Sequence, residues 1–332
     1  MNLHTNPELF TEAITATAQE MKLAEVYIEK DYWVTLALKT VFLSPIGEEA
    51  VFKGGTALSK CYKLIERFSE DIDLVVFRRE GERDNQLKSK IKKLTDLVCT
   101  VMPEIELEGI TRKMGMNRKT VHSYAKGAFS GNYGQIRDYI VLEATWLGSP
   151  EPYTVSEISS YVSDIMRNTG QSALIEEFQM HPFTVKVLTK ERTLCEKIMS
   201  LVRFSYTERP YEDLSVKIRH IYDIHMLLGD STVAGFFTSS GFDSLLNTVG
   251  KDDILTYKNN NDWLRVPPQH AVIYSAPEAT WTAIRQSYKT TFRDMVTGRL
   301  PDEADIINTL RMVSTRLQSV EWNAGSSAPP SC

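Results

Sequence analysis

Two aspartates, Asp71 and Asp73, flank a single isoleucine in the segment RFSEDIDLVV. The apolar residues that follow predict a β-strand over 72–77, and the side chains of a strand alternate between its two faces. Both carboxylates therefore point the same way, with their α-carbons about 6.6 Å apart from the rise of a strand. Two like charges this close repel each other unless a cation compensates them. The pair is thus a candidate ligand set for Mg²⁺, which binds carboxylate oxygens.

A glycine pair lies upstream of the aspartates, in the segment FKGGTALSK. Gly54 and Gly55 follow a short strand expected at 50–52 and predict a turn, with Thr56 as the N-cap of a helix that reaches Arg67. Glycine lets the backbone approach a ligand closely, and the first N–H groups of a helix bind anions. The segment therefore predicts a site for the phosphates of a nucleoside triphosphate beside the carboxylates.

Three further side chains flank this turn and strand. Ser69 either contacts phosphate or metal, or it caps the entry to the strand. Lys53 and Arg67 either neutralise phosphate charge or are solvated. A GGT segment alone is more often a turn, and a DxD pair often lies on a solvated strand edge, so it is the order of turn, helix and DxD strand that carries the prediction.

The elements around these residues predict an α+β fold. Before residue 190 we expect helices over 6–43 and 85–101, strands over 104–113, 135–146 and 183–188, and a basic loop over 112–134. The later pattern predicts helices over 190–204, 213–228, 236–249, 277–296 and 302–320. We therefore expect a mixed-sheet lobe with N-terminal helices at 1–189, a helical lobe at 190–322 that completes the active site, and a disordered tail at 323–332.

The composition agrees with a folded protein of two lobes. The chain has 332 residues, of which 42% are apolar and 24% charged, and its net charge of −5 excludes a strongly basic body. Its four cysteines are far apart and form no CxxC pair or Cys/His cluster, so we expect reduced thiols and no structural metal. The N-terminus has no signal-peptide pattern and no apolar run reaches membrane-spanning length, so we expect a cytoplasmic protein without a membrane partner.

Several segments resemble known families. The glycine pair, the helix and RFSEDIDLVV are similar to the signature of the polymerase-β-type nucleotidyltransferases. EKDYWVTLAL at 29–38, FKGGTALSKCYKLIERFSEDIDLV at 52–75, and KERTLCEKIMSL with HIYDIHMLL more closely resemble the AbiEii nucleotidyltransferase toxins of type IV toxin–antitoxin and abortive-infection systems. The resemblance spans 25–310 and fades at 112–135. It implies that the chain transfers a nucleoside monophosphate from an NTP to an acceptor hydroxyl, with two Mg²⁺ ions on Asp71 and Asp73 and an antitoxin encoded by a neighbouring gene.

The resemblance also selects residues outside the opening segments. In the wider superfamily a third acid on a neighbouring strand completes the metal site, and Glu143 in IVLEATW either fills this role as proton acceptor or is merely exposed. Lys197 would contact the triphosphate, although its position at the margin of a buried helix face also suits snorkelling. Asp223 would position the triphosphate or the acceptor in a cleft between the lobes, or it forms a helical ion pair with Arg219. Lys30 would anchor the N-terminal helix on the sheet.

The acceptor that we expect is the 3′ end of tRNA, whose modification would block translation and growth. Positive charge is concentrated at Lys88 and Lys92 in the expected helix and at Arg112 and Lys119 in the basic loop. A charge run is more often a solvated face, but aromatic residues interleaved with cations suit stacking on single-stranded RNA, and the loop contains His122, Tyr124, Phe129 and Tyr133. The alternatives are a protein or small-molecule acceptor, and a non-catalytic module that binds nucleotides.

Overall fold

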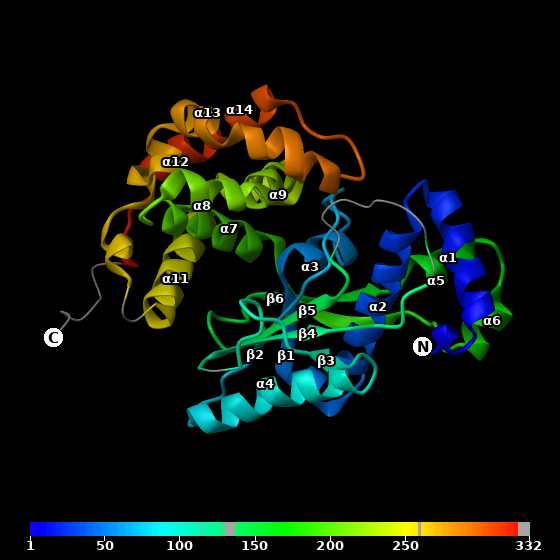
Figure 1. Cartoon of the computed structure of the whole chain (residues 1–332). Coiled ribbons are helices and arrows are strands. Elements are labelled where there is room, and N and C mark those ends of the chain that lie inside the picture. Colours follow the sequence, from blue (N-terminus) through cyan, green and yellow to red (C-terminus); the bar gives the residue numbers. More distant parts are fainter. Residues whose placement is uncertain (114, 128, 130–136, 258–259, 325–332) are drawn as a thin grey trace. The chain divides into compact units, whose positions relative to one another are not determined.

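The computed structural model describes residues 1–113, 115–127, 129, 137–257 and 260–324 of the chain. These residues form two compact units, and Figure 1 labels most of their helices and strands. The first unit contains residues 1–63, 68–146 and 153–188, and the second contains 64–67, 147–152 and the residues from Thr189 onward. The short segment 64–67, which precedes the two aspartates, therefore belongs to the second unit.

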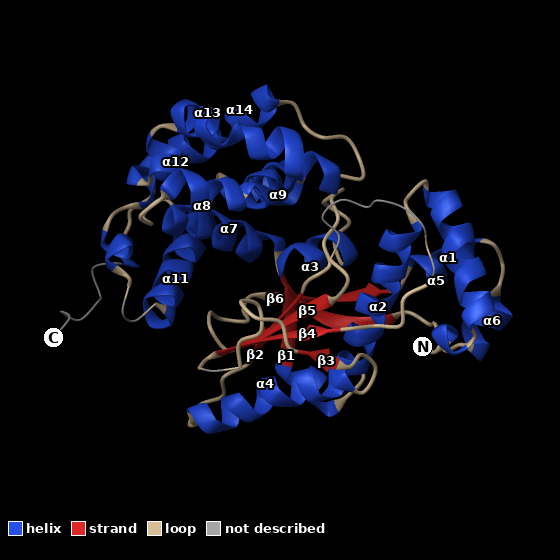
Figure 2. Ribbon diagram, in the orientation of Figure 1, coloured by secondary structure: helices blue, strands red, loops and turns tan. Residues whose placement is uncertain are grey.

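The first unit is built on a mixed sheet of seven strands in the order β3-β4-β5-β2-β1-β7-β6 (Figure 2). β1 pairs antiparallel with β2 and parallel with β7, and β2 pairs parallel with β5. The sheet and its helices confirm the predicted α+β class. The strands are β1 Ala50–Lys53, β2 Ile72–Val76, β3 Glu104–Ile105, β4 Asn117–His122, β5 Ile140–Thr145, β6 Tyr153–Ile158 and β7 Phe183–Leu188.

Among the described residues of the first unit, six α-helices accompany the sheet. α1 begins where the side chain of Asn6 accepts a hydrogen bond from the backbone N–H of Leu9, with Pro7 as its first residue, so the helix has a polar cap and a preset first turn. α2 is buried along most of its length and packs on α4. The helices are α1 Pro7–Met21, α2 Glu25–Phe42, α3 Gly54–Lys60, α4 Asp84–Cys99, α5 Tyr161–Asn168 and α6 Ser172–Glu177.

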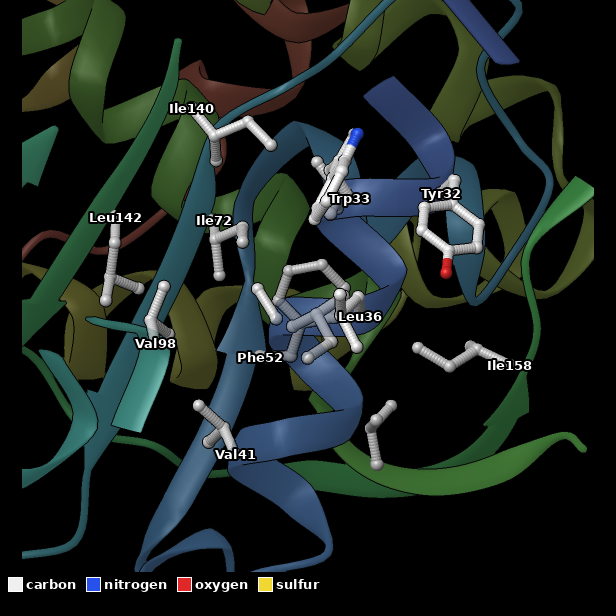
Figure 3. Close-up of a cluster of buried hydrophobic side chains, with 14 of the residues drawn as sticks. Tyr32, Trp33, Leu36, Val41, Phe52, Ile72, Val98, Ile140, Leu142 and Ile158 are labelled. Carbon is white, nitrogen blue, oxygen red and sulfur yellow. The ribbon is translucent and has the colours of Figure 1, made fainter. Parts of the chain in front are cut away.

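The main hydrophobic core lies on one face of this sheet (Figure 3). Trp33 and Leu36 of α2 pack there with Phe52 of β1, Ile72 of β2 and Leu142 of β5. Because strand side chains alternate between faces, the residues between these positions point to the opposite face. That face carries the candidate polar residues together with a small apolar cluster, which comprises Val51, Val75 and Leu188.

The second unit is helical, and every strand that the structure describes lies in the first. α7 begins at Thr189, whose hydroxyl accepts a hydrogen bond from the backbone N–H of Arg192. α7 packs against α9 and α11, and α9 packs against α14. No helix among the described residues is long and apolar enough to span a membrane. The helices are α7 Lys190–Phe204, α8 Pro210–Val216, α9 Ile218–Gly229, α10 Ser231–Phe237, α11 Ser240–Thr256, α12 Val272–Ser275, α13 Pro277–Ser287 and α14 Glu303–Gln318.

Two local predictions around the glycine pair were wrong. The helix expected over 56–67 is α3, which begins at Gly54 and ends at Lys60. Gly54 and Gly55 are therefore its first residues and not a separate turn, and the N-cap is Lys53 and not Thr56. Lys63 has a φ of 53°, a left-handed conformation that interrupts a right-handed helix, so the helical spacing of apolar residues beyond α3 does not continue the helix.

Other boundaries also differ from expectation. The basic loop contains strand β4, and only β3 forms within the strand predicted at 104–113. The helix expected over 213–228 is divided into α8 and α9, and Phe236–Val249 falls across α10 and α11. β6, α5 and α6 were not predicted. The predicted disordered tail begins at residue 323, and its residues after Ala324 lie outside the described part of the chain.

Candidate active site

Asp73 and Glu143 face each other on neighbouring strands of the first unit. β2 and β5 are paired in parallel with Asp73 opposite Glu143, and β1 places Lys53 opposite Asp73 on its other side. The three side chains share the face away from the main core, since Phe52, Ile72 and Leu142 occupy the other face of the same strands. The structure thus brings together the second aspartate of the DxD pair and the proposed third acid.

The electrostatics of Asp73 reflect this proximity. Burial, followed by the negative charges of Glu143 and Asp71, raises the pKa of the Asp73 carboxyl to about 7, while Lys53 and Lys119 act in the opposite direction. A carboxyl pKa raised in this way is typical of like charges that lie close together in a partly desolvated site. A bound cation would relieve this repulsion.

Gly54 lies directly against the Asp73 carboxylate. Its φ is 81°, and a Cβ atom added there would come 2.1 Å from Oδ2 of Asp73. Both facts disfavour a side chain, because a left-handed φ favours glycine and an added Cβ would force the Asp73 carboxylate or the start of α3 to move. The first glycine of the GGT segment therefore has a specific function, which is to let the start of α3 approach the acidic residue.

The threonine of the same segment fastens α3 to the DxD strand. Thr56 donates a hydrogen bond from Oγ1 to the carbonyl of Asp71 at 2.5 Å, and its hydroxyl lies 2.9 Å from that of Ser69. Thr56 is buried and Ser69 partly exposed. The order of residues quoted from the sequence thus corresponds to direct contacts between the GGT segment and the residues around Asp71.

Asp71 is held by a cation that sequence reasoning missed. The guanidinium of Arg137 pairs with the carboxylates of Asp71 and, at 2.6 Å, Glu70. Glu70 also pairs with Lys30 of α2, whose ammonium donates to the carbonyl of Tyr139 at 3.0 Å. Arg137 is a single arginine between the basic loop and β5, so no spacing or motif distinguishes it in the sequence.

Two side chains from β4 orient Glu143. Asn117 donates from Nδ2 to Oε1 of Glu143 at 2.7 Å, and the ammonium of Lys119 lies 3.5 Å from Oε2. Asn117 was not singled out because its strand was predicted as loop. Lys119, expected to bind the acceptor, lies beside the acidic cluster itself.

The four cations expected to bind the acceptor do not share one surface. Lys88 and Lys92 are exposed on α4, where Lys92 pairs with Asp96 at 2.6 Å. Arg118 reaches α4 through a hydrogen bond to Thr95, so the next residue on the strand, Lys119, faces away from that helix. Arg112 is exposed and its backbone pairs with that of Lys119.

Two aromatic residues of the basic loop, His122 and Tyr124, are buried. His122 is fully buried, with its ring nitrogens near the Thr120 hydroxyl and the Met102 carbonyl. Tyr124 is buried against Trp33 of the core. The prediction that these two rings bind RNA is wrong, because they complete the interior of the first unit. Tyr133 lies outside the described residues.

The donor chemistry of the acidic cluster fits a hard cation. Within the described ranges, no group of three or more histidine, cysteine or carboxylate side chains has the spacing of a formed metal site. Asp71 and Asp73 nevertheless offer oxygen donors, and the raised pKa of Asp73 marks the local excess of negative charge that Mg²⁺ would offset. These two residues remain the candidates to hold it.

In the second unit, Lys197 and Asp223 meet in a buried ion pair. The ammonium of Lys197 on α7 lies 2.6 Å from Oδ2 of Asp223 on α9. Arg67 binds the same carboxylate with two hydrogen bonds of 2.7 Å. The relative exposures are 5% for Arg67, 6% for Lys197 and 0% for Asp223. Lys197 and Asp223, which match the later family motifs, are therefore in contact. Arg67 binds the same carboxylate.

Comparison with known proteins decides the family. A model of the family described as "Nucleotidyl transferase AbiEii toxin, Type IV TA system" matches residues 36–308, most of the chain. The protein belongs to this family. The resemblance seen in the sequence is thereby confirmed, and the chain is a member of a nucleotidyltransferase toxin family of type IV toxin–antitoxin systems.

Two other comparisons add little to the AbiEii assignment. Among solved structures, MenT4, a nucleotidyltransferase toxin from Mycobacterium tuberculosis H37Rv, is similar with 14% sequence identity and a TM-score of 0.42. That similarity covers 90% of this chain and 98% of the MenT4 chain. No curated protein matches the sequence.

Proposed function

We propose that this AbiEii-family protein transfers a nucleoside monophosphate from an NTP to the 3′-terminal hydroxyl of tRNA. In this reaction the hydroxyl oxygen attacks the α-phosphate, a new P–O bond forms, and the bond to the β-phosphate breaks with release of pyrophosphate. The observation that supports the proposal most is the pairing of Asp73 with Glu143 on neighbouring strands. Gly54 lies against Asp73, at a distance that a residue with a side chain would not permit without a shift.

The acidic residues have separate roles in this proposal. Asp71 and Asp73 would hold two Mg²⁺ ions, which when bound supply positive charge for the polyphosphate. Glu143 would accept the proton of the attacking hydroxyl, since Asn117 and Lys119 fix the orientation of its carboxylate. Arg137 neutralises part of the charge of Asp71 in the structure described here.

Candidate residues for nucleotide binding lie in each unit. In the first unit we assign this role to Lys53, opposite Asp73, and to the start of α3 with Ser69, where the backbone of Gly54, Gly55 and Thr56 lies near the acids. In the second unit, Lys197 would hold the triphosphate through its charge, and Asp223 would fix the lysine in place.

The acceptor would be bound beside the acidic cluster. Arg112 and Lys119 are neighbours in the backbone pairing, and Lys119 reaches Glu143, so this pair offers positive charge near the proposed proton acceptor. Lys88 and Lys92 on α4 are less well placed, because α4 packs on the other face of β4. Replacing Arg112 by glutamate should therefore reduce RNA labelling at least fivefold or so, and more than replacing Lys88 or Lys92 in the same way.

The biological role follows from the family. We propose that modification of tRNA blocks translation and growth in the cytoplasm, and that an antitoxin encoded by a neighbouring gene counteracts the toxin. Coexpression with the product of that gene should restore growth.

The test combines growth with label transfer. Induced wild type should stop growth, whereas Asp71→Ala and Lys197→Ala should not, and Lys251→Ala serves as the control for loss of an exposed lysine outside the candidate sites. Each labelled NTP is incubated with purified protein and total RNA, purified tRNA or lysate, so that the label identifies the acceptor. Equal growth in all variants would overturn the toxin assignment, and label on protein or on a small molecule would overturn the tRNA assignment. Charge reversal of all four candidate cations with RNA labelling intact would exclude them as the acceptor site.

A further inference from the structure

Arg67, Asp223 and Lys197 form a buried cluster in which one carboxylate serves two cations. Arg67 donates from Nε to Oδ1 and from a terminal nitrogen to Oδ2 of Asp223, both at 2.7 Å. Lys197 approaches Oδ2 at 2.6 Å. The guanidinium therefore engages both oxygens in a fork, whereas the ammonium shares one of them.

The backbone around Arg67 is firmly attached to the second unit. The carbonyl of Glu66 accepts hydrogen bonds from the backbone N–H groups of Thr297, at 2.8 Å, and Gly298, at 3.2 Å. The N–H of Glu66 donates to the hydroxyl of Tyr222 at 3.1 Å, and Arg67 forms a bridge with Val296. The side chain of Arg67 is thus presented to Asp223 from a fixed segment.

The formal charges of the three groups sum to one positive charge. Burial acts to raise the pKa of Asp223, but the charges of Arg67 and Lys197 outweigh it and hold that pKa well below its ordinary value, so the carboxylate stays ionised. If Arg67 were absent, Asp223 and Lys197 alone would sum to zero. The arginine therefore changes the field that Lys197 presents, even though its own fork is directed at the carboxylate.

His220 reports the same positive field from α9. Burial first, and then the charges of Lys197 and Lys217, lower the pKa of His220 well below its usual value, against the opposing effect of Asp223. The ring is consequently neutral near pH 7. Its Nδ1 atom is buried and has no hydrogen-bond partner among the described residues. The lysine charges that contribute to this shift are positive, and a positive field favours the binding of an anion.

We propose that Arg67 is a positioning residue for nucleotide binding, which occupies the Asp223 carboxylate so that Lys197 retains a net positive field for the polyphosphate of the NTP. The identity of the anion rests on the proposed nucleotidyl transfer, whereas the charge relationship rests on the contacts of the cluster alone. Arg67 would act without touching the substrate. A purely structural role of Arg67 makes a different prediction, because it does not depend on the charge of Asp223.

A charge-compensation experiment separates these two roles. The probe is inorganic tripolyphosphate, and its affinity is measured by calorimetry at two salt concentrations. Arg67→Gln should weaken binding about tenfold and flatten its salt dependence, since one positive charge beside the site is lost. Arg67→Lys, which keeps the charge, should bind nearly as wild type does. The double variant Arg67→Gln with Asp223→Asn again has one positive charge in the cluster, and its amide oxygen can still accept a hydrogen bond from Lys197, so it should regain most of the lost affinity.

The matched control is Arg192→Gln in the same unit. Arg192 is also buried and ion-paired, with Glu196 and Asp252 as its partners, so its loss reports the general effect of removing a buried arginine. Tripolyphosphate binding should be unchanged in this variant. Thermal unfolding of every variant identifies any that do not fold. If Arg67→Gln does not fold, Arg67→Lys and the double variant still test the proposal. Both keep a net charge of one in the cluster, so both must bind tripolyphosphate.

Several outcomes would overturn the proposal. Wild-type affinity in Arg67→Gln would show that the arginine does not influence the anion, and a double variant weaker than Arg67→Gln would show that charge compensation is not the cause. Failure of the nucleotidyl transfer itself is recorded separately, as the absence of label transfer by wild type. Tripolyphosphate binding that follows the predicted charge order without label transfer would leave the charge relationship standing and refute the proposed reaction.

Discussion

Gly54 lies so close to Asp73 that a single methyl group at its α-carbon would come 2.1 Å from the carboxylate oxygen Oδ2. The sequence shows only that a glycine pair precedes a DxD strand. The structure adds the reason for the first glycine, which is to bring the start of α3 against the acid. Through this contact the GGT segment and the DxD strand form a single candidate site.

Gly54→Ala should therefore slow nucleotidyl transfer about a hundredfold while leaving the protein folded. The new methyl group must displace the Asp73 carboxylate or the start of α3, and misplacement by about 1 Å can cost about a hundredfold in rate. The matched control is Gly81→Ala, because Gly81 has a similar φ of 78° and nothing within 4 Å of an added Cβ. Both variants should lose about 1 kcal/mol of stability through backbone strain. Label transfer by Gly54→Ala at the level of Gly81→Ala would show that the contact is unimportant.

Asp73→Asn should stabilise the fold in the absence of Mg²⁺ and at the same time abolish transfer. The neutral amide removes the repulsion from Glu143 and Asp71 and the cost of burying a charge, which together raise the pKa of Asp73. We expect a gain of about 1–2 kcal/mol in the free energy of unfolding, measured in chelator by denaturant titration. Asp96→Asn, at an exposed carboxylate on α4, is the control and should change stability little.

The same experiment with Mg²⁺ tests the proposed metal site. Added Mg²⁺ should stabilise the wild type, because a cation would offset the crowded carboxylates, and should stabilise Asp73→Asn much less. If Mg²⁺ shifted both proteins equally, the acidic cluster would not be the place where the ion binds.

Local pattern was enough for elements whose neighbours agree with it. The apolar run after Asp71 predicted β2, and the helical spacing predicted α7 with its observed bounds, where Thr189 is the N-cap. The same reasoning failed for the helix after Gly55, where the apolar spacing continues but Lys63 adopts a left-handed φ of 53°. The spacing of apolar residues indicates which side chains would share a helix face. It does not indicate whether the backbone can adopt a helical conformation there.

Pairs that are distant in sequence could not be predicted from periodicity. The segment of β4 was predicted as loop because it is rich in arginine, lysine and glycine, yet it forms a strand in which the side chains of Thr120 and His122 lie within hydrogen-bond distance, at 2.9 Å. Lys197 was placed at the margin of a buried face, but it is buried because Asp223 on another helix compensates its charge. Lys197 is buried beside a partner on another helix, whereas Thr120 and His122 are polar residues that are not expected in a core.

Lys30→Met should destabilise the first unit, as expected if this lysine anchors α2. Lys30 is 1% exposed, pairs with Glu70 and donates to the carbonyl of Tyr139. Its loss leaves a buried carboxylate with Arg137 as its remaining described partner, so we expect a cost of about 2–4 kcal/mol in the free energy of unfolding. Urea denaturation measures this value.

The control for this variant is Lys92→Met, which removes an exposed lysine that pairs with Asp96 one helical turn away. Such pairs contribute only about 0.3–0.5 kcal/mol, so this variant should unfold at nearly the wild-type urea concentration. Equal effects of the two substitutions would contradict an anchoring role for Lys30.

Glu29→Gln should remove a pH dependence of stability that the wild type shows between about pH 4.5 and 7. Burial raises the pKa of Glu29 from 4.5 to about 7, although the backbone N–H of Gly127 and the charges of Lys126 and Lys30 lower it in part. In this window the folded protein keeps a proton that the unfolded chain has released, so stability falls as the pH rises. Above pH 7 the charged carboxylate is present in the folded state, at a cost of about 2–3 kcal/mol.

The glutamine variant should therefore match wild type near pH 4.5 and exceed its stability at pH 8, because the amide is neutral throughout and its oxygen can still accept the hydrogen bond from Gly127. Denaturant unfolding at intervals of half a pH unit gives the two profiles. Glu20→Gln, at an exposed position of α1, should leave the wild-type profile unchanged. Parallel profiles for wild type and Glu29→Gln would mean that the Glu29 carboxyl ionises in the folded protein as it does in the unfolded chain.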